Sequence, residues 1–446
     1  MHEGITASAG RAHAPAGRAH EGCGDHIPSA HAPTARGAKS PASTAPGHVA
    51  GPATSWAQAR STARRSAGGP LPAVTRMPDD ALGHALAAPL HALCDLPPFD
   101  TSAMDGWAVA GPGPWQPFGD LVLAGEEPAP MATGTAVPIA TGARLPSGAT
   151  AVLRREHAET CGGVVRRRAS APGALPAGRD IRPRGQECRS GEPLLPAGTT
   201  VTPAVLGLAA AAGCDRLSVH RRPRVELLLL GDELLSHGVP RGGRVRDALG
   251  PLFTPWLSSC GAEPIGVRMI GDDPGLLREA VDRSPADVVV TTGSTAAGPV
   301  DFLHDVLHRI GAALPVDSVA VRPGHPMLLA ELPDSTDGRS RRLVGLPGNP
   351  LAATAGWVTL ALPLLRRLGG HTDPEPHLLP ATADLPGHQH DTRLLPVLRT
   401  GYEVAPLPFD GPAMLRGLAL ADALAVVPPG GVEAGTTVEI LGLPGR

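Results

Sequence analysis

The middle of the chain alternates short apolar runs with segments of helical spacing. The run at 224–230 is almost wholly apolar and stops at Gly231-Asp232-Glu233, and the run at 287–290 stops at a turn rich in Thr, Gly and Ser. Unbroken apolar runs are typical of strands buried on both faces of a parallel sheet. The pattern predicts a mostly parallel α/β sheet. Its strands are expected at 224–230, 264–270 and 287–290, with helices at 252–260 and 274–283.

Two other regions show short apolar runs between Gly and Pro turns, which is typical of small β units. Runs at 121–123, 136–139, 150–154 and 164–167 predict a β domain. Runs at 424–427 and 437–441 predict a compact C-terminal β barrel. The fold class expected for the whole chain is therefore a multidomain α/β and β protein.

The N-terminal half contains helical and non-helical patterns. The segment 56–91 is rich in alanine at helical spacing, and Pro70 and Pro72 divide it into two predicted helices, the second around Ala81 to Leu86. A further helix is predicted at 203–212. Residues 1–55 have almost no large apolar side chains and are predicted to be a disordered tail, because such a segment cannot offset its ordering entropy.

Composition excludes several classes of function. The chain has 446 residues, a formal net charge of -3 and 2% aromatic residues, which favours neither nucleic-acid binding nor membrane-surface binding. No apolar run approaches the roughly 20 residues that span a bilayer. The six cysteines form no C-x-x-C pair, which is typical of reduced thiols and predicts a cytoplasmic location.

Three polar turns follow predicted strands of the α/β sheet. They are Gly231-Asp232-Glu233, the segment 291–298 and the segment 345–350, which reads Gly-Leu-Pro-Gly-Asn-Pro. Ligands of open α/β sheets bind beyond the carboxyl ends of the strands. Small residues let backbone N–H groups approach a ligand, and a following helix favours an anion such as phosphate. The three turns together predict a phosphate-binding site at one edge of the sheet.

Acidic residues at the ends of predicted elements are candidates for a metal site. Magnesium is usually held by one or two carboxylates together with substrate phosphates. In the Gly-Asp-Asp-Pro turn, we expect Asp273 to cap a helix rather than to bind a ligand. The four carboxylates proposed as metal ligands and catalytic groups are Asp105, Glu233, Asp272 and Asp301.

From residue 56 onward, the sequence resembles the molybdopterin molybdotransferase family (MoeA in bacteria, the E domain of gephyrin in animals). The resemblance rests on Ser102-Ala103-Met104-Asp105-Gly106, on Thr141-Gly142-Ala143, on the Ile-Arg-x-x-Gly segment 181–185, and on the turns at 231–234 and 345–350. These motifs are specific to that family.

The resemblance implies a homodimer whose active site includes parts of both chains. It also implies a discontinuous linker domain (56–97 and 183–222), a β domain (98–182), a molybdopterin-binding α/β domain (223–370) and a C-terminal β domain (371–446). The implied substrates are adenylylated molybdopterin and molybdate, with Mg²⁺ as cofactor and a separate molybdopterin adenylyltransferase as supplier. The implied substrate-binding residues are Thr141, Arg182, Glu187, Gly293, Ser294, Thr295, Arg322, Pro347, Gly348 and Asn349.

The sequence departs from the family at several positions. Ser294 stands where a second glycine is usual, and Asp247-Ala248-Leu249 replaces an Asp-Thr-Asn turn. Pro299 stands two residues before Asp301, where the family has an acidic residue. Family lysines appear here as Ser318, Arg322 and His325, and Arg399 and Arg416 are candidates to compensate for them.

Two other functions agree with part of the pattern. A non-catalytic scaffold protein that keeps the pterin pocket would explain the changed lysines, but it has no need of the carboxylates. A hydrolase of phosphate esters or nucleotide sugars on a related α/β domain would explain the three turns. It would not explain the segment 98–106.

Overall fold

The computed structural model describes residues 53–295, 302–335 and 338–444. The predicted tail up to residue 52 and the candidate ligand Asp301 lie outside these described residues.

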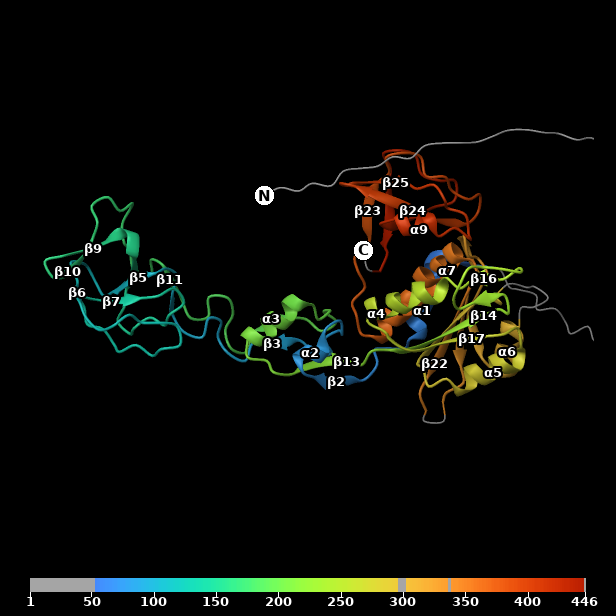
Figure 1. Cartoon of the computed structure of the whole chain (residues 1–446), viewed down its shortest axis with the longest axis horizontal. Helices are drawn as coiled ribbons and strands as arrows, with labels where there is room; N and C mark the ends of the chain where they lie inside the picture. Colours follow the sequence, from blue (N-terminus) through green and yellow to red (C-terminus); the bar gives the residue numbers. More distant parts are fainter. Residues whose placement is uncertain (1–52, 296–301, 336–337, 445–446) are drawn as a thin grey trace, which may run out of the picture. The chain divides into compact units, whose positions relative to one another are not determined.

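A six-stranded sheet forms the middle of the α/β region, in the order β17-β14-β18-β22-β21-β19 (Figure 1). The first four strands are parallel, and β21 is antiparallel to both of its neighbours. The prediction of a mostly parallel sheet is therefore confirmed. The strands are β14 Arg224–Leu230, β17 Glu263–Ile270, β18 Val288–Thr292, β19 Ala313–Asp317, β21 Leu328–Leu332 and β22 Arg341–Leu346.

Helices cover both faces of this sheet, because successive side chains of a strand point to opposite faces. In β14, Leu227 and Leu229 pack with α4, α7 and α8, whereas Leu228 and Leu230 pack with α5 and α6. Both sets are buried, which explains the unbroken apolar run of this strand. The helices are α4 Leu249–Ser259, α5 Pro274–Arg283, α6 Leu303–Arg309, α7 Pro350–Gly356, the π-helical η2 Trp357–Ala361 and α8 Leu362–Leu368.

Helix α5 begins where the sequence predicted. Oδ1 of Asp273 accepts hydrogen bonds from the backbone N–H groups of Gly275 and Leu276, at 2.7 and 2.9 Å. These bonds satisfy two of the donors that the first turn of a helix leaves unpaired. The interpretation of Asp273 as a helix cap is confirmed.

The start of the described chain packs against the α/β region. Helix α1 (Trp56–Ser66) buries Trp56, Ala59 and Ala63 in the same core as α4 and α8. Strand β1 (Thr54–Ser55) pairs in parallel with β20 (Val319–Arg322). The predicted disorder was therefore wrong for residues 54–55, because backbone pairing orders them. Helix α1, which we assigned to the linker domain, contributes its apolar side to the α/β core.

The discontinuous linker region has its own core, formed by apolar residues from 81–92 and 188–219. Its elements are β2 Ala73–Arg76, α2 Pro78–Ala81, β3 Leu90–His91, β12 Pro193–Leu195, α3 Pro203–Ala211 and β13 Leu217–His220. The helix predicted through Leu86 was wrong. Gly83 has a φ of +78°, which breaks the helix, and Ala85 and Leu86 instead form bridges with Thr200 and Val219.

A four-stranded sheet in the order β6-β7-β5-β8 organises the β region. Its strands are β5 Gly106–Val109, β6 Gln116–Pro117, β7 Thr135–Ile139 and β8 Ala151–Arg154. Around it lie β4 Thr101–Ser102, the 3-10 helix η1 Arg155–His157, β9 Ala158–Cys161, β10 Val164–Arg167 and β11 Ile181–Arg182. The strand predicted at 121–123 is not formed, since Val122 makes a single bridge to Ile139.

The C-terminal strands form a small barrel, as predicted. Strands β24, β26, β27 and β23 pair in this order, and β25 pairs with the other side of β24. A bridge between Ala381 and Val404 joins the end of β23 to β25 and closes the ring. The elements are β23 His377–Pro380, β24 Thr392–Thr400, β25 Glu403–Pro406, α9 Arg416–Leu420, β26 Ala423–Val427 and β27 Thr437–Gly442. Among the described residues, no helix combines the length and apolar character needed to cross a membrane.

Candidate functional site

The three polar turns predicted to meet at one edge of the sheet do line one cavity of about 610 Å³. They follow β14, β18 and β22, which are neighbours in the sheet, so their carboxyl ends lie side by side. The lining includes the candidate residues Glu233, Asp272, Gly293, Ser294, Thr295, Pro347, Gly348 and Asn349.

The first turn depends on a glycine. Gly231 has a φ of +135°, and a Cβ at this position would lie 2.2 Å from Oε2 of Glu233. The Glu233 carboxylate therefore occupies the space beside the Gly231 backbone. The neighbouring N–H of Asp232 is 3.4 Å from Oδ2 of Asp272, which connects this turn to the end of β17. The two carboxylates, Glu233 and Asp272, thus both border the cavity.

The second and third turns are in contact with each other. The Gly293 N–H donates to the carbonyl of Leu346 at 2.8 Å, and a Cβ on Gly348 would lie 3.6 Å from the Gly293 Cα. Gly293 and Ser294 have φ values of +90° and +52°. The left-handed conformation at Ser294 explains why a glycine suits this position in the family. The turns leave a floor of small residues on which a ligand can lie close to the backbone.

The altered turn at 247–249 also borders this cavity. Oδ1 of Asp247 accepts hydrogen bonds from the N–H groups of Leu249 and Gly250, at 2.9 and 3.2 Å. Asp247 thereby supports the start of α4, while Ala248 and Leu249 present no side-chain polar group to the lining. Arg246 lines the cavity beside them. Sequence reasoning missed Arg246, although its position next to the Asp247 turn could have indicated it.

The lining of this cavity carries more negative than positive charge. Glu233, Asp247 and Asp272 stand against one arginine, Arg246. Within the described residues, no three His, Cys, Asp or Glu side chains are grouped closely enough to hold a metal ion by themselves. Magnesium commonly uses one or two carboxylates and completes its shell with phosphates and water. Glu233 and Asp272 could supply the two carboxylates of such a magnesium site.

A second cavity of about 420 Å³ adjoins the first and shares Pro326, Pro347 and Asn349 with it. Its cations are Arg322, which pairs with Asp391 at 2.8 Å, and Arg393, which pairs with Asp410 at 2.7 Å.

Burial, and then the nearby Arg322, lower the pKa of His325, which also lines this second cavity. The C-terminal arginine at this cavity is Arg393, and neither Arg399 nor Arg416 is part of the lining. The Arg416 guanidinium lies over the Phe409 ring, 4.4 Å from its centroid. Sequence reasoning missed Arg393 and His388, because nothing in their local sequence marks which face of the barrel they occupy.

The candidate residues of the β region form a second group. Oδ1 of Asp105 accepts hydrogen bonds from both the backbone N–H and the hydroxyl of Thr141, at 2.6 and 2.9 Å. Both bonds hold the pKa of Asp105 below its usual range, and the backbone bond has the larger effect. A smaller contribution to this lowering of the Asp105 pKa comes from the positive charge of Arg155. Arg182 is on strand β11 and pairs with Thr101 of β4, in the segment that leads to Asp105.

The lining of the sheet-edge cavity includes none of Asp105, Thr141, Arg182 and Glu187. Glu187 is exposed, and its backbone N–H bonds to the carbonyl of Leu96 in the linker region.

The fold is that of a multidomain protein with adjoining cavities at the carboxyl edge of an α/β sheet, where such sheets commonly bind ligands. Three family profiles match in order along the chain. They are the MoeA N-terminal region (domain I and II) at 54–213, a probable molybdopterin binding domain at 226–367 and the MoeA C-terminal region (domain IV) at 379–443. The chain belongs to the MoeA family.

Curated relatives support the same assignment. The chain is 33% identical over 391 residues to a Mycobacterium tuberculosis protein named molybdopterin molybdenumtransferase 2, covering 80% of this chain and 91% of that protein. It is 32% identical over 303 residues to a Nostoc molybdopterin molybdenumtransferase, covering 65% and 67% of the two chains. A solved molybdopterin biosynthesis MoeA protein from Pyrococcus horikosii shares the fold with a TM-score of 0.68 at 24% identity, covering 88% of this chain and 100% of that one.

Proposed function

We propose that this protein is a molybdopterin molybdotransferase of molybdenum cofactor biosynthesis. It would take adenylylated molybdopterin and molybdate as substrates, release AMP and leave molybdenum on the pterin dithiolene. The observation that carries the proposal is the pair of adjoining cavities, one lined by Glu233 and Asp272 and the other by Arg322 and Arg393. A substrate with a pyrophosphate link that reacts with an oxyanion needs carboxylates that can hold a metal ion, and it also needs a positively charged surface.

Magnesium fits the carboxylate side of this pair. Carboxylates around a phosphate-binding cavity repel the substrate unless a cation lies between them. When bound, Mg²⁺ would neutralise pyrophosphate oxygens and make the phosphorus more electrophilic. Glu233 and Asp272 would hold the ion, and Asp301 is a further candidate. Arg322 and Arg393 would attract the anionic part of the substrate, and the backbone of 293–295 and 347–349 would position it.

The β-region group suggests how a second chain takes part. Asp105 accepts two hydrogen bonds from Thr141 that lower its pKa, yet neither residue lines the cavity of its own chain. We propose that the Asp105 group of one protomer completes the cavity of its partner in a homodimer. Arg182 and Glu187 would belong to the same contributed surface. A separate adenylyltransferase would supply the substrate, in the cytoplasm.

The experiment is AMP release from adenylylated molybdopterin with molybdate and magnesium. We expect turnover by the parent protein, and a loss of about a hundredfold in Glu233→Gln and in Asp105→Asn, since each removes a charge at the reacting phosphate. Glu159→Gln, on strand β9, is the control for charge removal away from the site. Pterin binding without AMP release by the parent would contradict the transferase proposal and favour the scaffold alternative.

Mixing the two inactive variants tests the shared site. Co-expressed Asp105→Asn and Glu233→Gln chains form hybrid dimers, and each hybrid has one site with both carboxylates intact if the site spans two chains. Random pairing then restores about a quarter of the parental activity. If each site is formed within one chain, the mixture stays as inactive as either variant alone.

A further inference from the structure

A third cavity, of about 600 Å³, lies at the opposite edge of the α/β sheet. It is formed where α5 and α6 end and where β22 begins, with Arg283, Arg309 and Arg341 among its lining residues. Strand β22 runs from Arg341 to Leu346, and the candidate site described above begins at Pro347. The third cavity is therefore separated from that site by the length of the strand.

Positive charge dominates this cavity. Five arginines line it against two aspartates, Asp282 and Asp334, which leaves a formal excess of three positive charges. The candidate site has the reverse balance, with three carboxylates and one arginine. The arginines of the third cavity are Arg278, Arg283, Arg309, Arg339 and Arg341.

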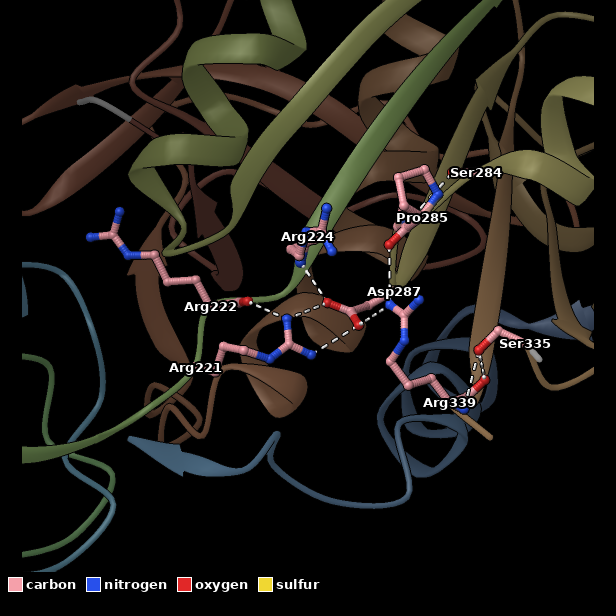
Figure 2. A network of polar contacts seen from close by, with 9 residues as sticks. Arg221, Arg222, Arg224, Ser284, Pro285, Asp287, Ser335 and Arg339 are labelled. Atoms are coloured by element: carbon pink, nitrogen blue, oxygen red, sulfur yellow. Dashed lines mark hydrogen bonds and ion pairs between the residues drawn. The ribbon is translucent and has the colours of Figure 1, made fainter. Parts of the chain in front are cut away.

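The buried carboxylate of Asp287 balances only part of this charge, because its main partner is Arg221. Asp287 accepts two hydrogen bonds from Arg221, at 2.8 and 2.9 Å, and one from the Arg224 backbone at 2.7 Å (Figure 2). Arg339 is farther away, with 3.7 Å between its Nη1 and Oδ1 of Asp287. The charge of Asp287 is thus balanced mainly by Arg221, which is not part of the cavity lining.

Contacts with Ser335 and Pro285 position Arg339. The Ser335 hydroxyl donates to the Arg339 carbonyl, and the Arg339 N–H donates to the Ser335 hydroxyl oxygen, both at 3.1 Å (Figure 2). The Arg339 side chain also donates to the Pro285 carbonyl at 3.1 Å. The bond to Pro285 holds the half-buried guanidinium beside the cavity lining.

Helix ends explain two of the arginines but not their grouping. Arg283 and Arg309 lie in the last turns of α5 and α6, where cations are favoured by the helix dipole. Arg283 pairs with Glu279 on an exposed surface, and such a pair contributes little. The Arg309 side chain makes no hydrogen bond or ion pair with the residues that the structure describes. Arg339 and Arg341 come from the β21–β22 hairpin, so no helix dipole accounts for them.

We propose that this cavity binds a small oligophosphate. The guanidinium group matches phosphate oxygens with parallel N–H donors, and several such groups around one cavity favour a ligand with several negative charges. A cavity of about 600 Å³ has the size of a typical small-molecule site. Its described lining contains no aromatic side chain on which a base could stack, so recognition rests on phosphate groups. This site is independent of the proposed transferase activity.

The test is calorimetric titration of the full chain with inorganic tripolyphosphate, in chelator and at low salt. The parent is expected to bind it at least about tenfold more tightly than orthophosphate, because more charges are satisfied. Arg309→Gln should weaken binding about tenfold, and the double variant Arg283→Gln with Arg309→Gln should weaken it further. The matched control is Arg367→Gln, an exposed last-turn arginine of α8 outside the cavity.

Further measurements show whether the ligand binds in this cavity. Binding should survive in Arg322→Gln, which removes one of the two arginines of the second cavity. ATP should bind no more than about threefold more tightly than tripolyphosphate. Hydrogen exchange should slow in 278–284 and 338–342 when the ligand is bound. The proposal is overturned if the parent does not bind, if Arg367→Gln loses as much affinity as Arg309→Gln, or if Arg322→Gln alone abolishes binding. A much tighter complex with ATP would also overturn it, because the adenine base would then contribute to binding.

Discussion

The carboxylate of Glu233 lies against the backbone of Gly231, so closely that a Cβ there would be 2.2 Å from Oε2. Glycine is therefore required at position 231, because the Glu233 side chain fills the space that a Cβ would need. Its φ of +135° is a conformation that side chains rarely adopt. The orientation of a proposed metal ligand thus depends on the absence of a side chain.

Replacing Gly231 by alanine should displace the Glu233 carboxylate. We expect Gly231→Ala to lower kcat/KM for AMP release by about tenfold or more, since a ligand shifted by about 1 Å no longer supports the reaction geometry. Gly238→Ala is a control matched in backbone strain, because Gly238 has a φ of +84° with nothing within 4 Å of its Cβ position. Equal losses in both variants would mean that backbone strain, not the carboxylate, is responsible.

The convergence of the three turns was predictable from the sequence for a physical reason. Parallel strands place their carboxyl ends at one edge, so turns that follow Leu230, Thr292 and Leu346 must lie near one another once the strands are neighbours. The strand bounds follow from unbroken apolar runs, which need no tertiary information. The same reasoning explains why Asp273 could be identified as a helix cap.

Residues that reach the site from other elements could not be predicted in this way. Arg393 reaches the second cavity from β24, and its role depends on how the barrel packs against the α/β sheet. The expected helix through Leu86 failed for a related reason. Alanine and leucine at helical spacing favour a helix, but Gly83 and the bridges to Thr200 and Val219 override this preference.

A lysine at position 325 should strengthen binding of the anionic substrate. Burial lowers the pKa of His325, so this side chain is neutral near pH 7. We expect His325→Lys to lower KM about fivefold by adding a positive charge to the second cavity, an effect of about 1 kcal/mol. The control is His390→Lys, which adds the same charge at an exposed position outside that lining. An unchanged KM in His325→Lys, or an equal decrease in both variants, would contradict this role.

Glycine at position 318 should stabilise the protein. Ser318 has a φ of +74°, and a left-handed conformation costs a residue with a side chain about 1–2 kcal/mol. Ser318→Gly removes this strain but gives the unfolded chain more freedom, so a net gain of about 0.5–1 kcal/mol in unfolding free energy is expected. Urea denaturation measures it.

The control for this substitution is Ser284→Gly. Ser284 has a φ of -63°, and its side-chain oxygen accepts a hydrogen bond from the Ala286 N–H. This change should destabilise the protein, because it relieves no strain and removes that bond. A loss of stability in Ser318→Gly as well would show that the strain relieved at position 318 is smaller than the entropy gained by the unfolded chain.

Acid should destabilise the fold partly through His371. Burial lowers the pKa of His371 to about 4, and the side chain contacts the Thr200 hydroxyl at 2.9 Å. Between this value and the unfolded pKa of about 6.5, the unfolded chain binds the extra proton. The stability that His371 contributes is therefore present above about pH 6.5 and is lost as the pH falls towards about 4, by up to about 3 kcal/mol.

His371→Gln removes this titration. We expect the variant to be less stable than the parent near pH 7, and the gap to narrow by about 2 kcal/mol near pH 4.5. Urea denaturation followed by tryptophan fluorescence at both pH values measures the difference. A gap that stays constant would mean that His371 does not bind the proton differently in the two states.

The most direct test of the proposed site is the magnesium dependence of AMP release. If Glu233 holds the ion, Glu233→Gln should raise the magnesium concentration for half-maximal release by about tenfold or more, because one of two protein carboxylates is lost. Substrate binding measured in chelator should stay the same or improve, since a repulsive charge is removed. An unchanged magnesium dependence in Glu233→Gln would contradict the placement of the metal in this cavity.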